Sequence, residues 1–223
     1  MPYRRTENVV RRLAEREASI LDAARAAASA GGMNAVQMAL IAERAGIAAG
    51  TVYRYFPSKT DLVAELVAAV AAQEIGAMRA AAAAAPGPLS ALAAALASFA
   101  TRALNERRLT WAVIGEPVDA DIDAVRLEFR KALANEIELR IKAAMAAGHL
   151  PEQNAAVAAP AIVGALLEGL IGPLAPDLGG DPVKSREAVQ TAALLSLRAL
   201  GASDPRARGL VAQIVLPEAV KTT

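Results

Sequence analysis

The chain has 223 residues, of which 55% are hydrophobic, and this is enough apolar material for one large domain or two modest ones. Cysteine is absent and His149 is the single histidine, which excludes disulfides, thiolate metal sites and most zinc sites and catalytic triads. The formal net charge of +1 is unevenly spread, because residues 1–60 hold nine Lys/Arg against five Asp/Glu and the remainder is mildly acidic. A basic N-terminal region predicts contact with a polyanion, the alternative being an ordinary solvated face.

The chain is rich in alanine, the strongest helix former, and poor in aromatic residues, so we expect an all-α fold of about nine helices. Residues 1–15 carry Arg4, Arg5, Arg11 and Arg12 and no apolar signal segment, which predicts a cytoplasmic protein with a basic N-terminal arm. This arm would either lie in a minor groove of DNA or serve as a solubilising tail. Apolar residues at helical spacing then predict a long first helix that ends at Gly31-Gly32.

Two short helices are expected at about 37–44 and 48–55, joined by a tight turn at Gly46, which together make a helix-turn-helix motif over about 37–56. Apolar residues would form its core: Val36, Leu40, Ile41, Ala42, Ala45, Ile47, Val52 and Phe56. The polar residues Thr51, Tyr53, Arg54 and Tyr55 would face outward, with Lys59 at the next helix start. Such side chains suit phosphates and base edges, although the two tyrosines could instead be partly buried packing residues.

Ser58 and Asp61 form a capping-box pattern at the start of a further long helix, which is expected to fray in the alanines before Pro86-Gly87-Pro88. The segment Ile20–Ala24, followed by Ile41–Lys59 with its Gly-Thr-Val-Tyr-x-x-Phe-x-x-Lys core, resembles the DNA-binding domain of TetR/AcrR-type regulators. The resemblance covers about residues 16–70, and domain boundaries at 16–62 and 63–223 follow from it.

The resemblance implies a homodimer whose recognition helices enter successive major grooves of a palindromic double-stranded DNA operator. It implies that Thr51 and Tyr53 hold phosphates, that Ala49, Arg54 and Tyr55 approach base edges or nearby phosphates, and that Lys59 binds phosphate at a helix N-terminus. The sequence departs from the family pattern at Gln37, where threonine is common, and at Ala48 and Ala49, which replace a serine and a basic residue. The DNA-binding set is therefore Gln37, Ala49, Gly50, Thr51, Tyr53, Arg54, Tyr55 and Lys59.

The remaining helices are expected near 88–104, 106–114, 121–147, 152–172 and 183–200. Between Gln153 and Pro176 the only charged residue is Glu168, but prolines and glycines interrupt this run, so we expect a buried helix or a subunit interface and no membrane helix. The small and aliphatic faces at 152–172 and 183–200 would form a four-helix dimer interface, or else an intramolecular core.

By analogy with the family, residues 63–223 would bind an effector and dimerise. Large apolar residues and isolated polar ones are the candidates for an effector pocket: Phe99, Trp111, Glu116, Arg126, Phe129, Arg130, Met145 and Glu168. No nucleophile elbow, phosphate loop or metalloprotease motif occurs, so neither enzyme activity nor a cofactor or metal is expected.

The sequence thus predicts a DNA-binding transcriptional regulator, in the first instance a repressor that a small, mainly apolar effector releases from its operator. The alternatives are an architectural DNA-binding protein, or a regulator that acts through a protein partner, neither of which needs an effector.

Overall fold

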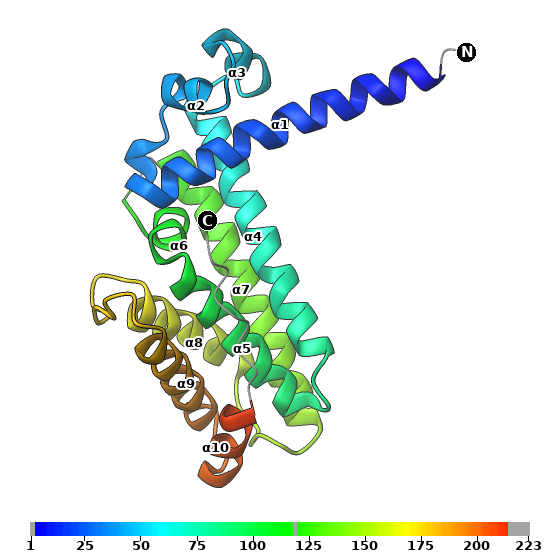
Figure 1. The fold of residues 1–223 in the computed structure, drawn as a ribbon. Helices are drawn as coiled ribbons and strands as arrows, with labels where there is room; N and C mark the ends of the chain where they lie inside the picture. The colour runs from blue at the N-terminus through cyan, green and yellow to red at the C-terminus, as the bar shows by residue number, and fades with distance from the viewer. Residues whose placement is uncertain (1–2, 118–119, 214–223) are drawn as a thin grey trace.

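A computed structural model describes residues 3–117 and 120–213, and every secondary-structure element among them is helical (Figure 1). The elements, in chain order, are α1 (Tyr3–Gly31), the 3-10 helix η1 (Met33–Ala35), α2 (Met38–Arg44), α3 (Ala49–Tyr55), α4 (Lys59–Ala83), α5 (Pro88–Asn105), α6 (Arg107–Ile114), α7 (Ala120–Ala146), α8 (Ala155–Leu170), α9 (Pro182–Ala199) and α10 (Asp204–Gln213). We call α1–α3 with η1 and the start of α4 the head, and α5–α10 with the rest of α4 the body. The expected all-α fold is confirmed.

The head is built around the turn between α2 and α3. Gly46 has a φ of 64°, a left-handed conformation that glycine adopts at no steric cost. The Ile47 N–H then donates to the Ala42 carbonyl over 3.0 Å and ends α2. Val36, Ile41 and Val52 are fully buried, whereas the expected core residues Leu40, Ala45 and Ile47 are only partly buried. The predicted helix-turn-helix is therefore present, with Met33 and Met38 as additional buried members.

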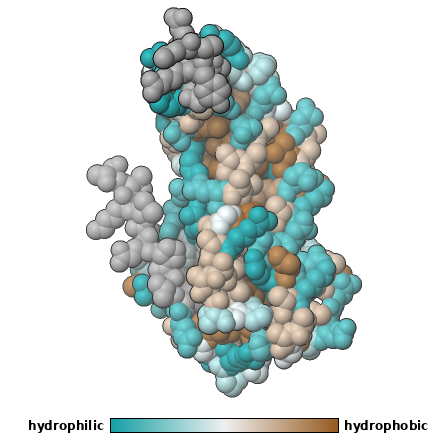
Figure 2. All heavy atoms as spheres, turned by 90° about the vertical axis from the view of Figure 1, so that its right-hand side faces the viewer, coloured by the Kyte–Doolittle hydropathy of each residue, from teal (hydrophilic) through white to brown (hydrophobic). Residues whose placement is uncertain are grey.

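Helix α4 connects the head to the body (Figure 1). The capping box at its start is confirmed: the Asp61 N–H donates to the Ser58 hydroxyl over 3.1 Å, and the Ser58 N–H donates to the Asp61 carboxylate over 3.0 Å. Its 25 residues span about 37 Å at 1.5 Å per residue, and it ends in the alanines at Ala83 as expected. Figure 2 views the face on which α4 lies, where small apolar residues form a band down the molecule between polar flanks.

The body packs around α5, whose alanines and leucines are buried on nearly every side. Helices α4, α7 and α9 all pack against it, and small side chains such as Ala93, Ala97 and Ala100 let these helices approach closely. Helix α8 packs between α7 and α9.

The described residues differ from the sequence expectations at both ends. Helix α1 begins at Tyr3, so residues 3–15, expected as an arm, continue the first helix without a break. Helix α10 was not expected, and it is stabilised by burying Ala207 and Val211 in contacts with α9 and α5. A two-residue apolar stripe of this kind is too short to stand out in a sequence. No helix in the described part of the chain is both long and apolar enough to cross a membrane.

Two buried carboxylates hold the body helices together. Glu74 of α4 is 5% exposed and accepts two hydrogen bonds from the Arg102 guanidinium of α5, at 2.8 and 2.9 Å, which raises the pKa of Arg102. Glu136 of α7 is 3% exposed and accepts hydrogen bonds from Arg79 of α4 and from Arg140, both at 2.9 Å. Burial alone would raise the pKa of Glu136, but these two arginines together hold it below its ordinary value.

Replacing Glu136 tests this assignment. Glu136→Gln should lower the free energy of unfolding at pH 7 by about 2 kcal/mol, because two arginines lose their charged partner. The pKa of Glu136 is lower in the folded state than its unfolded-state value of 4.5, so the ionised carboxylate adds to the free energy of unfolding above pH 4.5. This contribution is lost as the pH falls through the folded-state pKa of Glu136. Urea denaturation should therefore show the deficit of the variant narrowing below about pH 4.5.

Glu128→Gln is the matched control, because Glu128 lies on the same helix and pairs with Lys131 in solvent. Its effect should stay within about 0.5 kcal/mol. Equal effects of the two substitutions, or a deficit of Glu136→Gln that is independent of pH, would contradict the assignment.

Candidate nucleic-acid interface and its link to the body

Helix α3 presents a polar face to solvent at the free end of the head. Tyr53 is 50% exposed, and Arg54, Ala49 and Gly50 are exposed beside it, while Val52 on the opposite face is fully buried. Thr51 is partly buried at the edge of this face. A two-turn helix anchored by one buried face and open on the other is the arrangement that helix-turn-helix proteins insert into a major groove.

The two tyrosines of α3 differ in their surroundings. Tyr55 is partly buried and packs against the hydrophobic core, as the packing interpretation expected, whereas Tyr53 is free to reach outward. The Arg54 guanidinium lies over the Tyr55 ring, 5.7 Å from its centroid, so a cation–π contact orients this arginine along the exposed face. Arg54 and Tyr53 are thus the side chains of α3 best placed to meet a ligand.

Lys59 and Gln37 lie on either side of α3 in the sequence. Lys59 is exposed in the first turn of α4, directly after the capping residue Ser58. Gln37 is exposed at the start of α2, where its side chain donates to the Asn34 carbonyl over 3.3 Å and does not cap the helix. All eight residues expected to bind DNA therefore lie in the helix-turn-helix or the first turn of α4, and their roles remain predictions.

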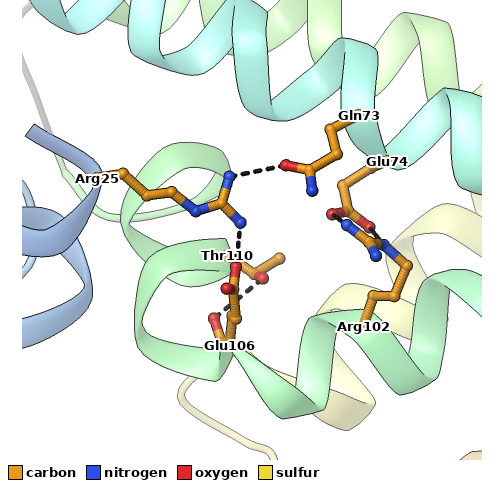
Figure 3. A network of polar contacts seen from close by, with 6 residues as sticks. All are labelled: Arg25, Gln73, Glu74, Arg102, Glu106 and Thr110. Carbon is orange, nitrogen blue, oxygen red and sulfur yellow. Dashed lines mark hydrogen bonds and ion pairs between the residues drawn. The ribbon is translucent and has the colours of Figure 1, made fainter. Parts of the chain in front are cut away.

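Figure 3 shows a polar network that joins the head to the body. Arg25 of α1 donates to the Gln73 side chain of α4 over 2.8 Å and forms an ion pair with Glu106, the residue between α5 and α6. The Glu74–Arg102 pair lies beside it and ties α4 to α5. These partners are 48 and 81 residues apart along the chain, so no local sequence pattern could have paired them.

A second link centres on Glu116, which follows α6. Its carboxylate accepts a hydrogen bond from the Met33 N–H of η1 over 2.8 Å and forms an ion pair with Arg108 at 3.3 Å. Gly32 permits this close approach, since a Cβ at that position would lie within 2.7 Å of both Glu116 carboxylate oxygens.

The carbonyl of Glu116 contacts the body, because Arg126 of α7 donates to it and to the Ala112 carbonyl near the end of α6. The Arg126 guanidinium is buried, and this desolvation lowers its pKa. Glu116 therefore connects η1 of the head to α7 of the body through one residue.

The residues expected to line an effector pocket lie in different places. Phe99 and Phe129 are 2% exposed within the core, and Trp111 is partly buried and covers Gly115. Arg126 and Met145 are 19 residues apart on α7, about 28 Å, so they cannot line one small pocket together. Their role in binding an effector remains a prediction.

Arg130 and Glu168 do come together, in a groove of about 380 Å³ between α7 and α8. Its other lining residues are mostly apolar: Leu127, Lys131, Ala134, Pro160, Val163, Gly164 and Leu167. The Arg130 Nε atom is buried without a hydrogen-bond partner. This volume is at the lower end of the range for small-molecule sites.

The turn between α2 and α3 and the exposed polar face of α3 place this chain in the broad class of helix-turn-helix proteins. Residues 20–66 match the sequence profile of the family described as bacterial regulatory proteins, tetR family. The match is confined to the N-terminal domain, which is therefore similar to the DNA-binding domain of that family.

The sequence similarity to curated relatives is confined to the head. The chain is 57% identical over 54 residues to the HTH-type transcriptional repressor KstR of Rhodococcus jostii, and 59% identical over 49 residues to KstR of Mycobacterium tuberculosis. These matches cover 24% and 22% of this chain, and 26% and 22% of the two relatives. The chain thus matches about a quarter of the length of these relatives.

The fold, in contrast, is similar over most of the chain. A crystal structure of RolR in complex with resorcinol has a TM-score of 0.66 at 20% identity, covering 94% of this chain and 99% of that one. FadR from Bacillus subtilis in complex with stearoyl-CoA has a TM-score of 0.68 at 19% identity, covering 80% and 96%. The body therefore shares its fold with these two proteins, although its sequence is only distantly similar.

The Glu116 link predicts a local opening when its carboxylate is removed. Glu116→Ala should leave the Met33 N–H unpaired and lower the free energy of unfolding by about 1–2 kcal/mol. Hydrogen exchange at the Met33 amide should become faster, while exchange within α5 should change only with global stability.

Glu106→Ala is the comparison, because it removes an ion pair with Arg25 whose two side chains are 46% and 26% exposed. Its cost should be below about 1 kcal/mol. Unchanged exchange at Met33 in the Glu116 variant would show that the link does not exist in solution.

Proposed function

We propose that this protein is a sequence-specific DNA-binding transcriptional regulator, a repressor that a small, mainly apolar effector releases from a palindromic operator. The observation that carries this proposal is the exposed face of α3, with Tyr53 and Arg54 outward, in a head that matches known transcriptional repressors. We infer no enzymatic activity, and as a regulator of bacterial genes the protein would act in the cytoplasm.

Arg54 and Lys59 would have different tasks on DNA. The Arg54 guanidinium is planar and held by the Tyr55 ring, which suits bidentate recognition of a guanine edge. Lys59 carries a compact charge at the positive end of the α4 dipole, which suits a phosphate without sequence preference. Tyr53, Thr51 and Gln37 would add phosphate contacts that fix the register of the head on the duplex.

The operator would be palindromic because the protein would be a homodimer through α8 and α9, as expected for residues 152–172 and 183–200. Val157 of α8 and Val183 and Leu195 of α9 are 65%, 64% and 58% exposed in the single chain. Ala161, Gly164 and Ala165 of α8 are also exposed, and such small residues let a second helix approach closely. In a two-fold interface both protomers contribute these same residues, so this surface would pack against its own copy.

An effector would act by preferring one of two arrangements of the heads, since a ligand can shift an equilibrium only through differential affinity. The groove between α7 and α8 is the candidate site, with its apolar lining and the charged side chains of Arg130 and Glu168, which would orient a polar end of the effector. A displacement of α7 would be transmitted to the head through Arg126 and Glu116. A displacement of α4 would move the head directly, because α4 begins in the head.

Selection of binding sites from a random duplex pool at physiological salt tests the proposal. We expect an enriched palindrome. Lys59→Ala should weaken binding to all sequences alike and reduce the salt dependence of log Kd by about 1, because one phosphate contact is lost. Arg54→Ala should cost about 1–3 kcal/mol on the selected duplex and relax the preference at one base position of each half-site.

Arg206→Ala is the control, since Arg206 is exposed on α10 at the far end of the molecule, and it should bind as the parent protein does. Binding without an enriched sequence would favour the architectural alternative. Absence of binding would refute the proposal, and an enriched palindrome supplies the probe for effector screening.

The dimer interface makes a separate prediction. Leu195→Glu should shift the protein from dimer to monomer in light scattering at micromolar concentration, because a charge would enter an apolar interface twice. Leu139→Glu, on the exposed side of α7 at 55% exposure, is the matched control and should remain dimeric. A parent protein that is monomeric under these conditions would refute the interface.

A further inference from the structure

The first part of α1 has no packing partner in the single chain. Ile20 is the first fully buried residue, and all residues from Asn8 to Ala18 are exposed. Helix α1 nevertheless extends 17 residues before Ile20, which corresponds to a rod of about 25 Å. The family match begins only at residue 20, so this extension lies outside the matched domain.

The direction of the extension limits what it can meet. It projects from the end of the molecule that carries α2 and α3, and it points away from the side on which α8 and α9 lie (Figure 1). In a dimer formed through α8 and α9, the partner would therefore lie on the opposite side of the head. The extension would point outward along the bound duplex, beyond the half-site that α3 reads.

The exposed residues from Asn8 to Ala18 include three arginines and two glutamates, a small positive excess that favours a polyanion. Arg12 and Arg16 are exposed and one helical turn apart, so they lie on one face of α1. Among the described side chains of this stretch, Arg11 forms an ion pair with Glu15 at 3.5 Å, and this pair leaves Arg12 and Arg16 uninvolved. Two arginines spaced by about 6 Å along a helix can reach successive phosphates of one strand.

The helical conformation also decides how the extension can bind. A helix with its side chains is about 10–12 Å wide, whereas the minor groove of B-DNA is about 6 Å wide. The described part of the basic segment is helical, and in this conformation it would be too wide to enter the minor groove. Contact would be made with phosphate oxygens along the outside of the duplex.

We propose that the N-terminal extension of α1 binds the phosphate backbone of duplex DNA that flanks the operator, through Arg12 and Arg16. The proposal rests on the proposed function, because it places the duplex across α3. It assigns the extension a role in affinity and in the length of the binding site, without sequence preference.

The test uses the selected duplex in two forms, one ending flush with the half-sites and one extended by ten base pairs of unrelated sequence on each side. The full-length protein should bind the extended duplex at least tenfold more tightly at low salt. The slope of log Kd against log salt concentration should be steeper by about 3–4 for the extended duplex than for the flush one, since a dimer would add four phosphate contacts.

The double variant Arg12→Gln/Arg16→Gln should bind both duplexes with the affinity that the parent shows for the flush one. Glutamine keeps the helix propensity close to that of arginine, and circular dichroism checks that the helix content is retained. Lys142→Gln/Arg206→Gln removes the same charge from exposed positions on α7 and α10, outside the proposed dimer interface, and it should retain the tenfold preference.

Equal affinity of the parent protein for both duplexes would overturn the inference while leaving the proposed function intact, because the operator is still bound. A preference that survives in the Arg12/Arg16 variant would also overturn it. A parent protein that binds neither duplex would instead refute the proposed function. An extension that pairs with a second copy would appear as a larger assembly in light scattering without DNA, and this outcome too would overturn the inference.

Discussion

The arrangement of the whole molecule depends on α4 being one unbroken helix shared by the head and the body. Its start is fixed by the reciprocal hydrogen bonds of Ser58 and Asp61 beneath α3, and its middle is fixed to α5 by the buried Glu74–Arg102 pair. A helix with all of its backbone hydrogen bonds intact bends little, so a shift of its body end becomes a tilt of the head. The position of α3 is therefore set by contacts far from it.

Two further contacts limit that tilt. Arg25 ties α1 to α4 and to the α5–α6 junction, and Glu116 ties η1 to α6 and, through Arg126, to α7. These polar links add to apolar packing, because α1 also contacts α4 and α6, and its buried residues belong to the same hydrophobic core as the body. A change in the orientation of the head would therefore have to alter both the polar links and the packing of α1 against α4 and α6.

The same features explain how sequence and structure are conserved differently between this chain and its relatives. The KstR repressors match the head at 57–61% identity, and on the proposed function the head would present a fixed set of side chains to a regular duplex. The body keeps its helical fold at about 20% identity to RolR and FadR. Packing of aliphatic side chains tolerates many substitutions of similar volume, whereas contacts to bases and phosphates do not.

The sequence by itself determined the all-helical class, the helix-turn-helix around Gly46, the capping box at Ser58 and most helix boundaries in the body. These are local properties, set by periodicity, turn residues and capping residues within a few positions of one another. Only the tertiary structure decided that Glu116 contacts η1, that Arg25 spans three elements, that Arg130 and Glu168 share a groove, and that residues 3–15 continue α1. The first three depend on which helices lie side by side, and residues 38 to 83 positions apart leave no trace of their contact in the local pattern.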